Sequence, residues 1–372
     1  MVFVSIGFRF RVEVEALNMV EPMGAYTKHR FVPVYRQVHK GGEGQKVVGY
    51  RILYAPAVSG QSINYGYTKV LVELEKLKNP TNPRLCEECS NYEVRGGFTK
   101  RSVGRAESET ESGDKKVKGI EHDKRICECI VEDITGYMQP IGAPERKTSP
   151  VSFSYMVPDT ESAVPKIEPQ FHVRYSYEGG RPEHAPFTIE SGTGIYMLGV
   201  TIDVDRIGRL KDGSYVSDYE DRVTMAFKAL EVLIEGLTFG AKKSRYLPIL
   251  ETLGAVVAIS EPLPFMVSPP RVYRNGVNYI ITTVKRAVDY VNALNNFNQH
   301  IHIVYMDKEG IVDKDTIEKI KSGSNAVTDE GADTVSQLIE HVLKKVNSYI
   351  NEKKNNMKFA DCRELLKSSA RS

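Results

Sequence analysis

The first sixteen residues alternate between apolar and polar side chains, and this alternation limits the fold more than any other feature. Even-numbered positions from Val4 to Val14 are apolar, whereas most odd-numbered positions are small or charged. Successive side chains of a strand point to opposite faces, so residues 2–16 predict one long strand with an apolar and a polar face. Such strands are typical of a sheet with helices on one face and solvent on the other. We therefore expect Arg9 and Arg11, on the polar face, to be available to a ligand.

Two helices and several further strands are predicted after this first strand. Apolar residues recur at helical spacing over residues 59–77 and 218–237, and further strands are predicted at 125–134, 151–156, 171–177, 194–203 and 253–259. The order strand, helix, strands, helix, strand is that of an RRM-like or ferredoxin-like βαββαβ core. We therefore predict an α+β protein, in which helices and loops are inserted into such a core.

The predicted domain organisation follows from these elements. We assign residues 1–79 and 125–260 to a discontinuous RRM-like core. Residues 80–124 contain a stretch rich in glycine, serine and glutamate with few bulky apolar side chains, and such a segment predicts a partly disordered insertion. Residues 137–170 are assigned to a thumb-like loop insertion. Residues 261–372 form a C-terminal extension with a helical tail, clearest over residues 334–350.

Local charge is more informative than the total. The net charge is only +2, but Gly24–Gly60 contains six basic residues against one acid, Glu43, and Pro262–Val288 contains four basic residues and no acid. Segments of one sign create local positive potential and favour an anionic partner. No signal peptide and no apolar run of membrane-spanning length is visible, and five cysteines do not suggest a secreted disulfide framework. We expect a cytoplasmic protein without a membrane partner.

Three loops at the ends of predicted core elements combine basic residues with a hydroxyl residue, near glycine and proline. Phosphate groups are bound by such point charges, guanidinium groups and backbone amides. Each loop alone could be a solvated turn, but the recurrence favours nucleic-acid binding. The candidate residues are Thr27, Lys28, His29 and Arg30 in the first loop, Arg146, Lys147 and Thr148 in the second, and Lys242, Lys243, Ser244 and Arg245 in the third.

His172 and Arg174 are two positions apart on a predicted strand, so both side chains face the same side. On an exposed sheet face, such a pair can contact phosphate, sugar or base. The alternative is a buried structural histidine.

Five short strings occur in an order that resembles one family. They are Thr-Lys-His-Arg at 27–30, Gly-Tyr-Met with Gly-Ala-Pro and Arg-Lys-Thr-Ser at 136–149, Ser-Tyr-Met-Val-Pro at 154–158, Gln-Phe-His-Val-Arg-Tyr-Ser at 170–176 and Lys-Ser-Arg-Tyr-Leu-Pro at 243–248. Together they resemble the DevR/Csa-type CRISPR autoregulator family, the crRNA-binding backbone subunit of archaeal type I (I-A-like) Cascade. The strings span most of residues 1–290.

This resemblance implies an RRM-like protein that polymerises into a helical filament along crRNA. Such a subunit holds the backbone of the guide, contacts target DNA indirectly through the guide, and associates with other Cascade subunits. The resemblance thus implies a non-catalytic, RNA-binding antiviral protein. The alternatives are an RNA endonuclease of the CRISPR system and a DNA-binding transcriptional autoregulator. Nuclease relatives use an aspartate in the loop after the first strand, but residues 18–35 contain no aspartate.

The cysteines depart from this resemblance. Cys86 and Cys89 have metal-ligand spacing, and Cys127 and Cys129 are predicted to lie on one face of a strand. Four thiolates could bind a structural zinc ion. Disulfides, in a hyperthermophile, and unpaired core thiols are the alternatives. We expect no cofactor to be required for function, and any metal site to be structural.

Overall fold

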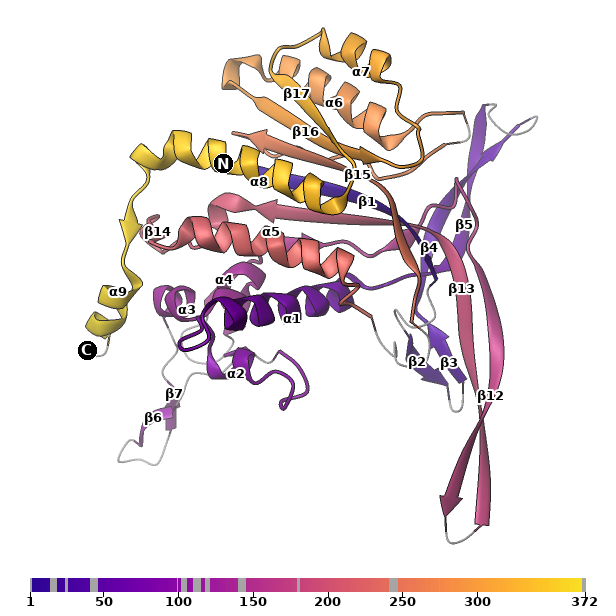
Figure 1. The fold of residues 1–372 in the computed structure, drawn as a ribbon, viewed down its shortest axis with the longest axis horizontal. Coiled ribbons are helices and arrows are strands. Elements are labelled where there is room, and N and C mark those ends of the chain that lie inside the picture. The colour runs from indigo at the N-terminus through magenta and orange to yellow at the C-terminus, as the bar shows by residue number, and fades with distance from the viewer. Residues whose placement is uncertain are drawn as a thin grey trace.

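A β-sheet runs through the centre of the protein, and helices cover both of its faces (Figure 1). The protein is seen in a computed structural model that describes residues 2–13, 19–23, 26–40, 46–98, 100–101, 106–109, 115–117, 121–139, 145–178, 181–240, 247–273 and 275–369. The core elements, in chain order, are β1 (Phe3–Glu13), α1 (Gly60–Lys78), β10 (Val151–Phe153), β13 (Arg181–Asp203), α5 (Tyr219–Glu235) and β15 (Leu250–Glu261).

These six elements form the predicted βαββαβ core. The strands lie in the order β15–β1–β13–β10, and every neighbouring pair is antiparallel. The predicted α+β, ferredoxin-like class is therefore confirmed. The apolar face of β1 packs under α1 and α5, because Ile6 and Phe8 share one hydrophobic cluster with Leu71 and Phe227.

The C-terminal extension adds strands as well as helices. β16 (His300–Asp307) pairs with β15, and β17 (Val327–Ala332) pairs with β16, so the sheet continues beyond the core. The expected helical tail is present as α8 (Val335–Lys353), whose first turn is capped by the Thr334 hydroxyl. α8 lies on the same face as α1 and α5. The other helices of the extension are α6 (Tyr279–Ala293) and α7 (Lys314–Lys321).

Most of the polar face of β1 is covered by other parts of the chain. The Ser5 hydroxyl donates to the Phe265 carbonyl and accepts from the Val267 N–H, and the segment after β15 thereby lies across this face. Arg9 is buried, with its guanidinium paired to Asp159 and Glu309. The expectation that Arg9 is available to a ligand is wrong, because carboxylates far along the chain pair with it. Arg11 is largely exposed and is paired with Glu251.

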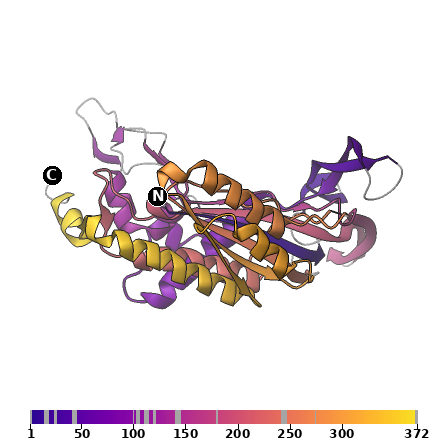
Figure 2. The ribbon, with the colours of Figure 1, turned by 90° about the horizontal axis from the view of Figure 1, so that it is seen from above.

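Two hairpin arms project at one end of the sheet in both ribbon views (Figures 1 and 2). The first is formed by β4 (Phe31–His39) and β5 (Val47–Pro56), and the second by β12 (Lys166–Glu178) with the first half of β13. Beside them lie β2 (Met19–Met23) and β3 (Tyr26–His29). The longest arm thus begins at Lys166, and the thumb-like insertion predicted at 137–170 stays a prediction.

The described residues between 80 and 150 form short helices and short strands. The described elements are α2 (Glu87–Ser90), β6 (Ala106–Glu109), β7 (Lys115–Val117), α3 (His122–Glu128), α4 (Ile130–Thr135), β8 (Tyr137–Gln139) and β9 (Glu145–Lys147). Residues 80–98 are ordered, since Cys89 and Tyr92 are buried in the main core. Of the segment predicted to be partly disordered, residues 99, 102–105, 110–114 and 118–120 lie outside the described residues.

The strand predicted at 125–134 is wrong, because this segment forms α3 and α4. Its alternating pattern comes from charged side chains that are themselves buried. Glu132 pairs with Arg101 and Arg125, and Asp133 pairs with Arg222. Polar side chains therefore face the interior here, so the spacing of apolar residues does not indicate which secondary structure the segment forms.

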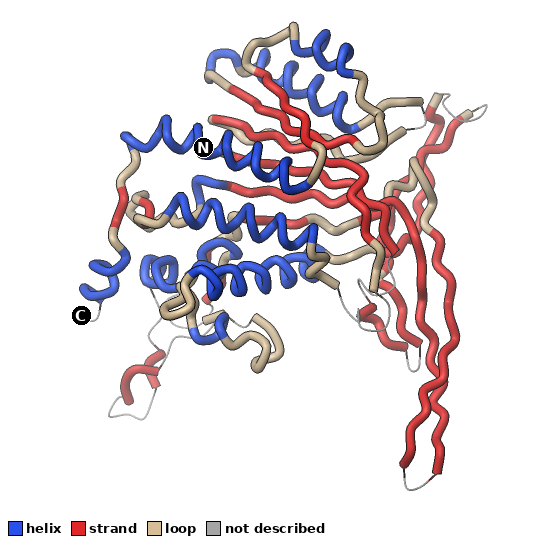
Figure 3. The backbone as a smooth tube through the Cα atoms, in the orientation of Figure 1, coloured by secondary structure: helices blue, strands red, loops and turns tan. Residues whose placement is uncertain are grey.

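Smaller elements complete the fold, as the tube in Figure 3 shows. They are β11 (Val157–Pro158), β14 (Tyr215–Val216), β18 (Phe359–Ala360), α9 (Cys362–Ser369) and the 3₁₀ turns Val204–Arg206, Asn295–Phe297 and Lys354–Asn356. Among the described residues, no helix has the length and apolar character needed to cross a membrane.

Candidate nucleic-acid interface and metal centre

The first basic loop lies at the base of the two arms. β3 pairs with the middle of β13, where Tyr26 is opposite Thr188. The Arg30 carbonyl accepts from the Ala57 N–H at 2.9 Å, and its guanidinium lies 3.5 Å from the Tyr155 hydroxyl. Lys28 and Arg30 are half-buried. The side chain of Thr27 lies outside the described residues, so its predicted role is neither supported nor contradicted.

His29 belongs to the interior. Its side chain is 1% exposed, its backbone N–H donates to Glu190 at 2.8 Å, and its Nδ1 lies 3.4 Å from the same carboxylate. The prediction that His29 contacts RNA is therefore corrected, since a ligand cannot reach a side chain packed against β13. Its role is to fix the loop, so that Lys28 and Arg30 on either side are held in place.

His172 lies close to this loop in the sheet. β13 separates β12 from β3, and His172 is opposite Phe187, next to the pairing of Thr188 with Tyr26. Two strand spacings amount to roughly 10 Å. The exposed His172 ring stacks on Phe187, with centroids 5.4 Å apart, so the buried-histidine alternative does not hold. The Arg174 side chain lies outside the described residues.

The β4–β5 arm carries charged and aromatic residues that the sequence interpretation did not select. Arg36 lies directly opposite Arg51, and like charges in this position repel each other. Tyr50 and Tyr54 are 67% and 74% exposed, and Tyr35 packs edge-on against Tyr50. Cationic side chains interleaved with exposed aromatic rings are typical of surfaces that bind single-stranded nucleic acid. In the sequence, the large side chains of Tyr50, Ile52 and Tyr54 at alternate positions could have indicated this surface. All three are exposed in the structure.

The second basic loop divides into two different environments. Lys147 is only 6% exposed and forms an ion pair with the buried Asp133. Burial lowers the pKa of Lys147, while the Asp133 carboxylate opposes that shift. The prediction that Lys147 binds RNA is corrected, because its charge is already neutralised inside the protein. Gly136 explains part of this motif: its φ is +67°, and a Cβ there would lie 2.5 Å from the Lys147 carbonyl.

Arg146 and Thr148 remain exposed on the other side of the same loop. They line a cavity of about 420 Å³ together with two further exposed arginines, Arg206 and Arg209, and Lys147 borders the same cavity despite its ion pair. His122 also lines this cavity, and burial lowers the pKa of its imidazole.

The first and second loops do not form one surface. The first loop reaches β13 at Ile189, whereas the strand that follows the second loop, β10, pairs with β13 at Ile202. In Figure 1, α3 and α4 likewise lie at the opposite end of the molecule from β3. The predicted set is therefore spread over two separate places.

The third predicted loop, with Lys242, Lys243, Ser244 and Arg245, lies outside the described residues. The described residues that follow it lead into β15, whose Leu250 pairs with Val12 near the end of β1.

Three cysteines form the group that could hold a metal. The sulfur atoms of Cys86, Cys89 and Cys129 lie within 4.8 Å of one another, and all three are buried. Cys127 is not part of this cluster, because it forms a disulfide with Cys362 of α9. The predicted four-cysteine set is thus corrected to three, since residues 127 and 129 lie at the junction of two helices rather than on one strand face.

Comparison with known proteins places the fold and its ordered strings in a family. The model of the family described as CRISPR-associated negative auto-regulator DevR/Csa2 matches residues 6–283. A Saccharolobus solfataricus protein named CRISPR-associated aCascade subunit Cas7/Csa2 2 is 30% identical over 329 residues, which cover 83% of this chain and 93% of that protein. A second protein of this organism, CRISPR-associated protein Cas7/Csa2 1, is 31% identical over 303 residues, covering 78% and 86%.

A solved structure supports the fold assignment. A chain of the CRISPR RNA-guided surveillance complex, pre-nicking, has a TM-score of 0.50 at 13% identity and covers 92% of this chain and 99% of that one. The family model spans the whole βαββαβ core, from β1 through β15. This chain therefore belongs to the CRISPR-associated DevR/Csa2 family.

Proposed function

We propose that this chain is a non-catalytic crRNA-binding backbone subunit of a Cascade interference complex. Copies of it assemble along the guide RNA, associate with other Cascade subunits, and leave the bases of the guide free to pair with target DNA. The names of its relatives support this proposal, since one is a Cascade subunit and the similar fold comes from an RNA-guided surveillance complex.

The observation that carries the proposal is the positive charge of the β4–β5 arm. The described residues of β4 and β5 include Arg36 and Arg51 and no acidic residue, and Lys28 and Arg30 lie at their base. Positive charge on neighbouring strands attracts a phosphate backbone irrespective of base sequence. A subunit that must accept any guide needs such sequence-independent binding.

The arms also offer flat apolar groups to unpaired bases. Tyr50 and Tyr54 on the first arm, and Phe171 and Tyr175 on the second, are all at least 67% exposed. Each base has a π-face, so stacking of this kind tolerates any sequence. The proposed RNA-binding set is therefore Lys28, Arg30, Arg36, Arg51 and His172, with Thr27, Arg174 and residues 242–245 as predictions outside the described side chains.

Charge reversal at the base of the arms tests this placement. We expect Lys28→Glu with Arg30→Glu to weaken binding of single-stranded RNA at least about tenfold, and to reduce the slope of log K against log salt by about 1.4, because about two phosphate contacts are lost. Binding is measured by fluorescence anisotropy at several salt concentrations. The matched control is Lys314→Glu with Lys319→Glu, the same charge change on exposed positions of α7.

Equal losses in both double variants would show that only net charge matters and would contradict the assignment to the arms. Circular dichroism verifies that both variants are folded. In the same preparation, labelled RNA incubated with divalent metal should stay intact, and cleavage would favour the endonuclease alternative. Tighter binding to duplex DNA than to RNA would favour the autoregulator alternative.

A further inference from the structure

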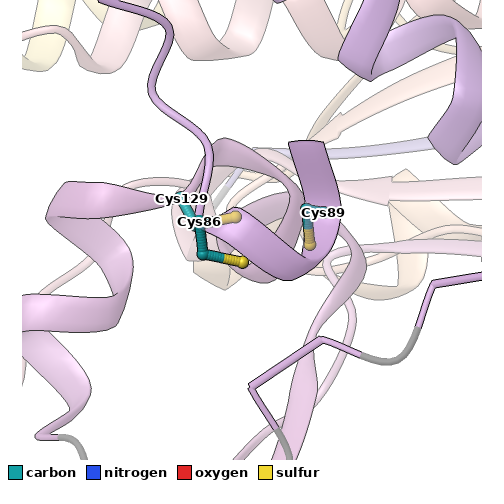
Figure 4. Close-up of side chains that lie close together, drawn as sticks. All are labelled: Cys86, Cys89 and Cys129. Carbon is teal, nitrogen blue, oxygen red and sulfur yellow. The ribbon is translucent and has the colours of Figure 1, made fainter. Parts of the chain in front are cut away.

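Three cysteines from two distant parts of the chain meet inside the protein. Cys86 and Cys89 come from the start of α2, and Cys129 lies between α3 and α4. Their exposed fractions are 7%, 0% and 0%. The three side chains approach one another at the junction of these helices (Figure 4). We call this group the three-cysteine cluster.

The backbone around the cluster holds the two segments together. The Ile130 N–H, next to Cys129, donates to the Arg84 carbonyl at 2.9 Å. The Cys129 N–H donates to the Arg125 carbonyl at 3.0 Å, and the Ser90 N–H donates to the Cys86 carbonyl at 2.9 Å. These main-chain hydrogen bonds fix the backbone that carries the sulfur atoms on each side of the cluster. The cluster is therefore built from both sides by the fold, and not merely a chance approach of three side chains.

The sulfur separations suit one ion. A tetrahedral zinc ion with bonds of about 2.3 Å to sulfur places its sulfur ligands roughly 3.8 Å apart. Sulfur atoms that all lie within 4.8 Å of one another need only small adjustments to reach that spacing. In a [4Fe–4S] cluster each cysteine binds a different iron atom, which spreads the cysteine sulfur atoms farther apart, and a [2Fe–2S] cluster needs four ligands, two on each iron. A single soft cation, which thiolates prefer, fits better.

The surroundings supply compensating charge. Three thiolates and Zn²⁺ carry a net charge of about −1. The Lys100 ammonium is close enough to all three thiols to interact with them electrostatically, and it is held by the Thr135 carbonyl at 3.0 Å. Arg101 also interacts with Cys86 and Cys129, but its charge is shared with Glu132, so Lys100 is the main compensating cation. A buried anionic centre needs such cations, because an unpaired buried charge is costly.

We propose that Cys86, Cys89 and Cys129 bind one zinc ion, which fastens the insertion at residues 80–98 to α3 and α4. Among the described residues no fourth cysteine, histidine or carboxylate joins the cluster, so water or a group outside those residues completes the coordination. Cys127 takes no part, since its sulfur is bonded to Cys362. The site is structural and stands independently of RNA binding.

Metal analysis of the full-length protein tests the proposal. We expect about one equivalent of zinc per chain after dialysis, measured by plasma mass spectrometry, and loss of most of it in Cys89→Ser. The matched control is the double variant Cys127→Ser with Cys362→Ser, which removes the other two cysteines and should retain the zinc. Zinc absent from the wild-type chain, or lost only from the control, would overturn the assignment.

A second measurement uses the wild-type chain, so its result does not depend on whether Cys89→Ser folds. Titration with a mercurial thiol reagent should release the zinc to a chromophoric chelator, with three thiols modified for each ion released. The same chain loaded with cobalt(II) should show a thiolate-to-metal charge-transfer band. Reaction of three thiols without zinc release, and no such band with cobalt, would establish that the cluster consists of free thiols.

Discussion

The β4–β5 arm and the interior beside α4 both carry basic side chains, yet those side chains have different surroundings. On the β4–β5 arm, Arg36 faces Arg51 and the described strands carry no acid. In the interior, Asp133 accepts from both Lys147 and Arg222, and all three side chains are buried. The first region is positive and open to an anion, whereas the second is neutral and closed.

This difference shows that basic composition alone does not identify a binding site. The loops 27–30 and 146–149 look alike in sequence, but Lys147 of the second is paired in the interior. A buried cation must have a carboxylate partner, and that partner need not be near it in sequence. The pair Arg222–Asp133 joins residues 89 positions apart. The partner, not the composition, determines whether a lysine can bind phosphate.

The largest effect is expected from removing the shared carboxylate of the interior. Asp133→Ala leaves Lys147 buried without a carboxylate partner and leaves Arg222 with Asp218 alone. The variant should lower the free energy of unfolding by about 3–5 kcal/mol. Urea unfolding followed by circular dichroism measures this. The control, Lys228→Ala, breaks an exposed pair with Glu231 and should cost less than about 1 kcal/mol. A comparable loss of unfolding free energy in the two variants would contradict the inference that buried basic side chains depend on their carboxylate partners more than exposed ones do.

An intermediate effect is expected from acid. Burial opposes ionisation of Glu75, but hydrogen bonds from Arg84 and Asn79 lower its pKa below the usual 4.5. Burial likewise opposes ionisation of Asp218, and Arg222 and Arg84 lower its pKa. Since both pKa values are lower in the folded state, these groups stabilise the protein above the pKa of the unfolded chain. That stability is lost as the pH falls from about 4.5 through the folded pKa values.

Urea unfolding at a series of acidic pH values measures this dependence. Glu75→Gln should reduce the slope below pH 4.5 and lower stability at neutral pH by about 1.5–3 kcal/mol, since hydrogen bonds to a charged group are lost. RNA binding by the arginines of the arms should persist over any acidic range in which the fold survives. If Glu75→Gln left the pH dependence of the free energy of unfolding unchanged, Glu75 would not contribute to the acid sensitivity.

The smallest expected effect is on RNA binding, and it distinguishes the β4–β5 arm from the cavity beside Arg146. Arg51→Ala should weaken binding of single-stranded RNA by about 1 kcal/mol, a factor of roughly five. Arg146→Ala should change it less than about twofold in the isolated chain, because Arg146 lies beside a separate cavity. Anisotropy titrations of both variants at one salt concentration make the comparison. A larger loss in Arg146→Ala would relocate the main RNA contact to the β9 end.

Much of the fold could be predicted, but only some of the site. The βαββαβ order and α8 were read correctly, because residue periodicity reports which side of an element is buried. The strand predicted at 125–134 failed where Glu132 and Asp133 are buried as ion pairs, since periodicity assumes that polar side chains face water. The placement of Lys28, Arg30 and His172 near one another required the pairing of β3 and β12 with β13.

The sequence by itself determined the family, the α+β core and the excess of positive charge between Gly24 and Gly60, because each is written in local order and composition. Only the tertiary structure decided which cations and cysteines are available. Cys127 and Cys129 are two positions apart, but one is bonded to Cys362, 235 residues away, and the other faces Cys86 and Cys89. The physical reason is that ion pairs, disulfides and metal sites join atoms that are near in space, and folding brings these atoms together from distant parts of the chain.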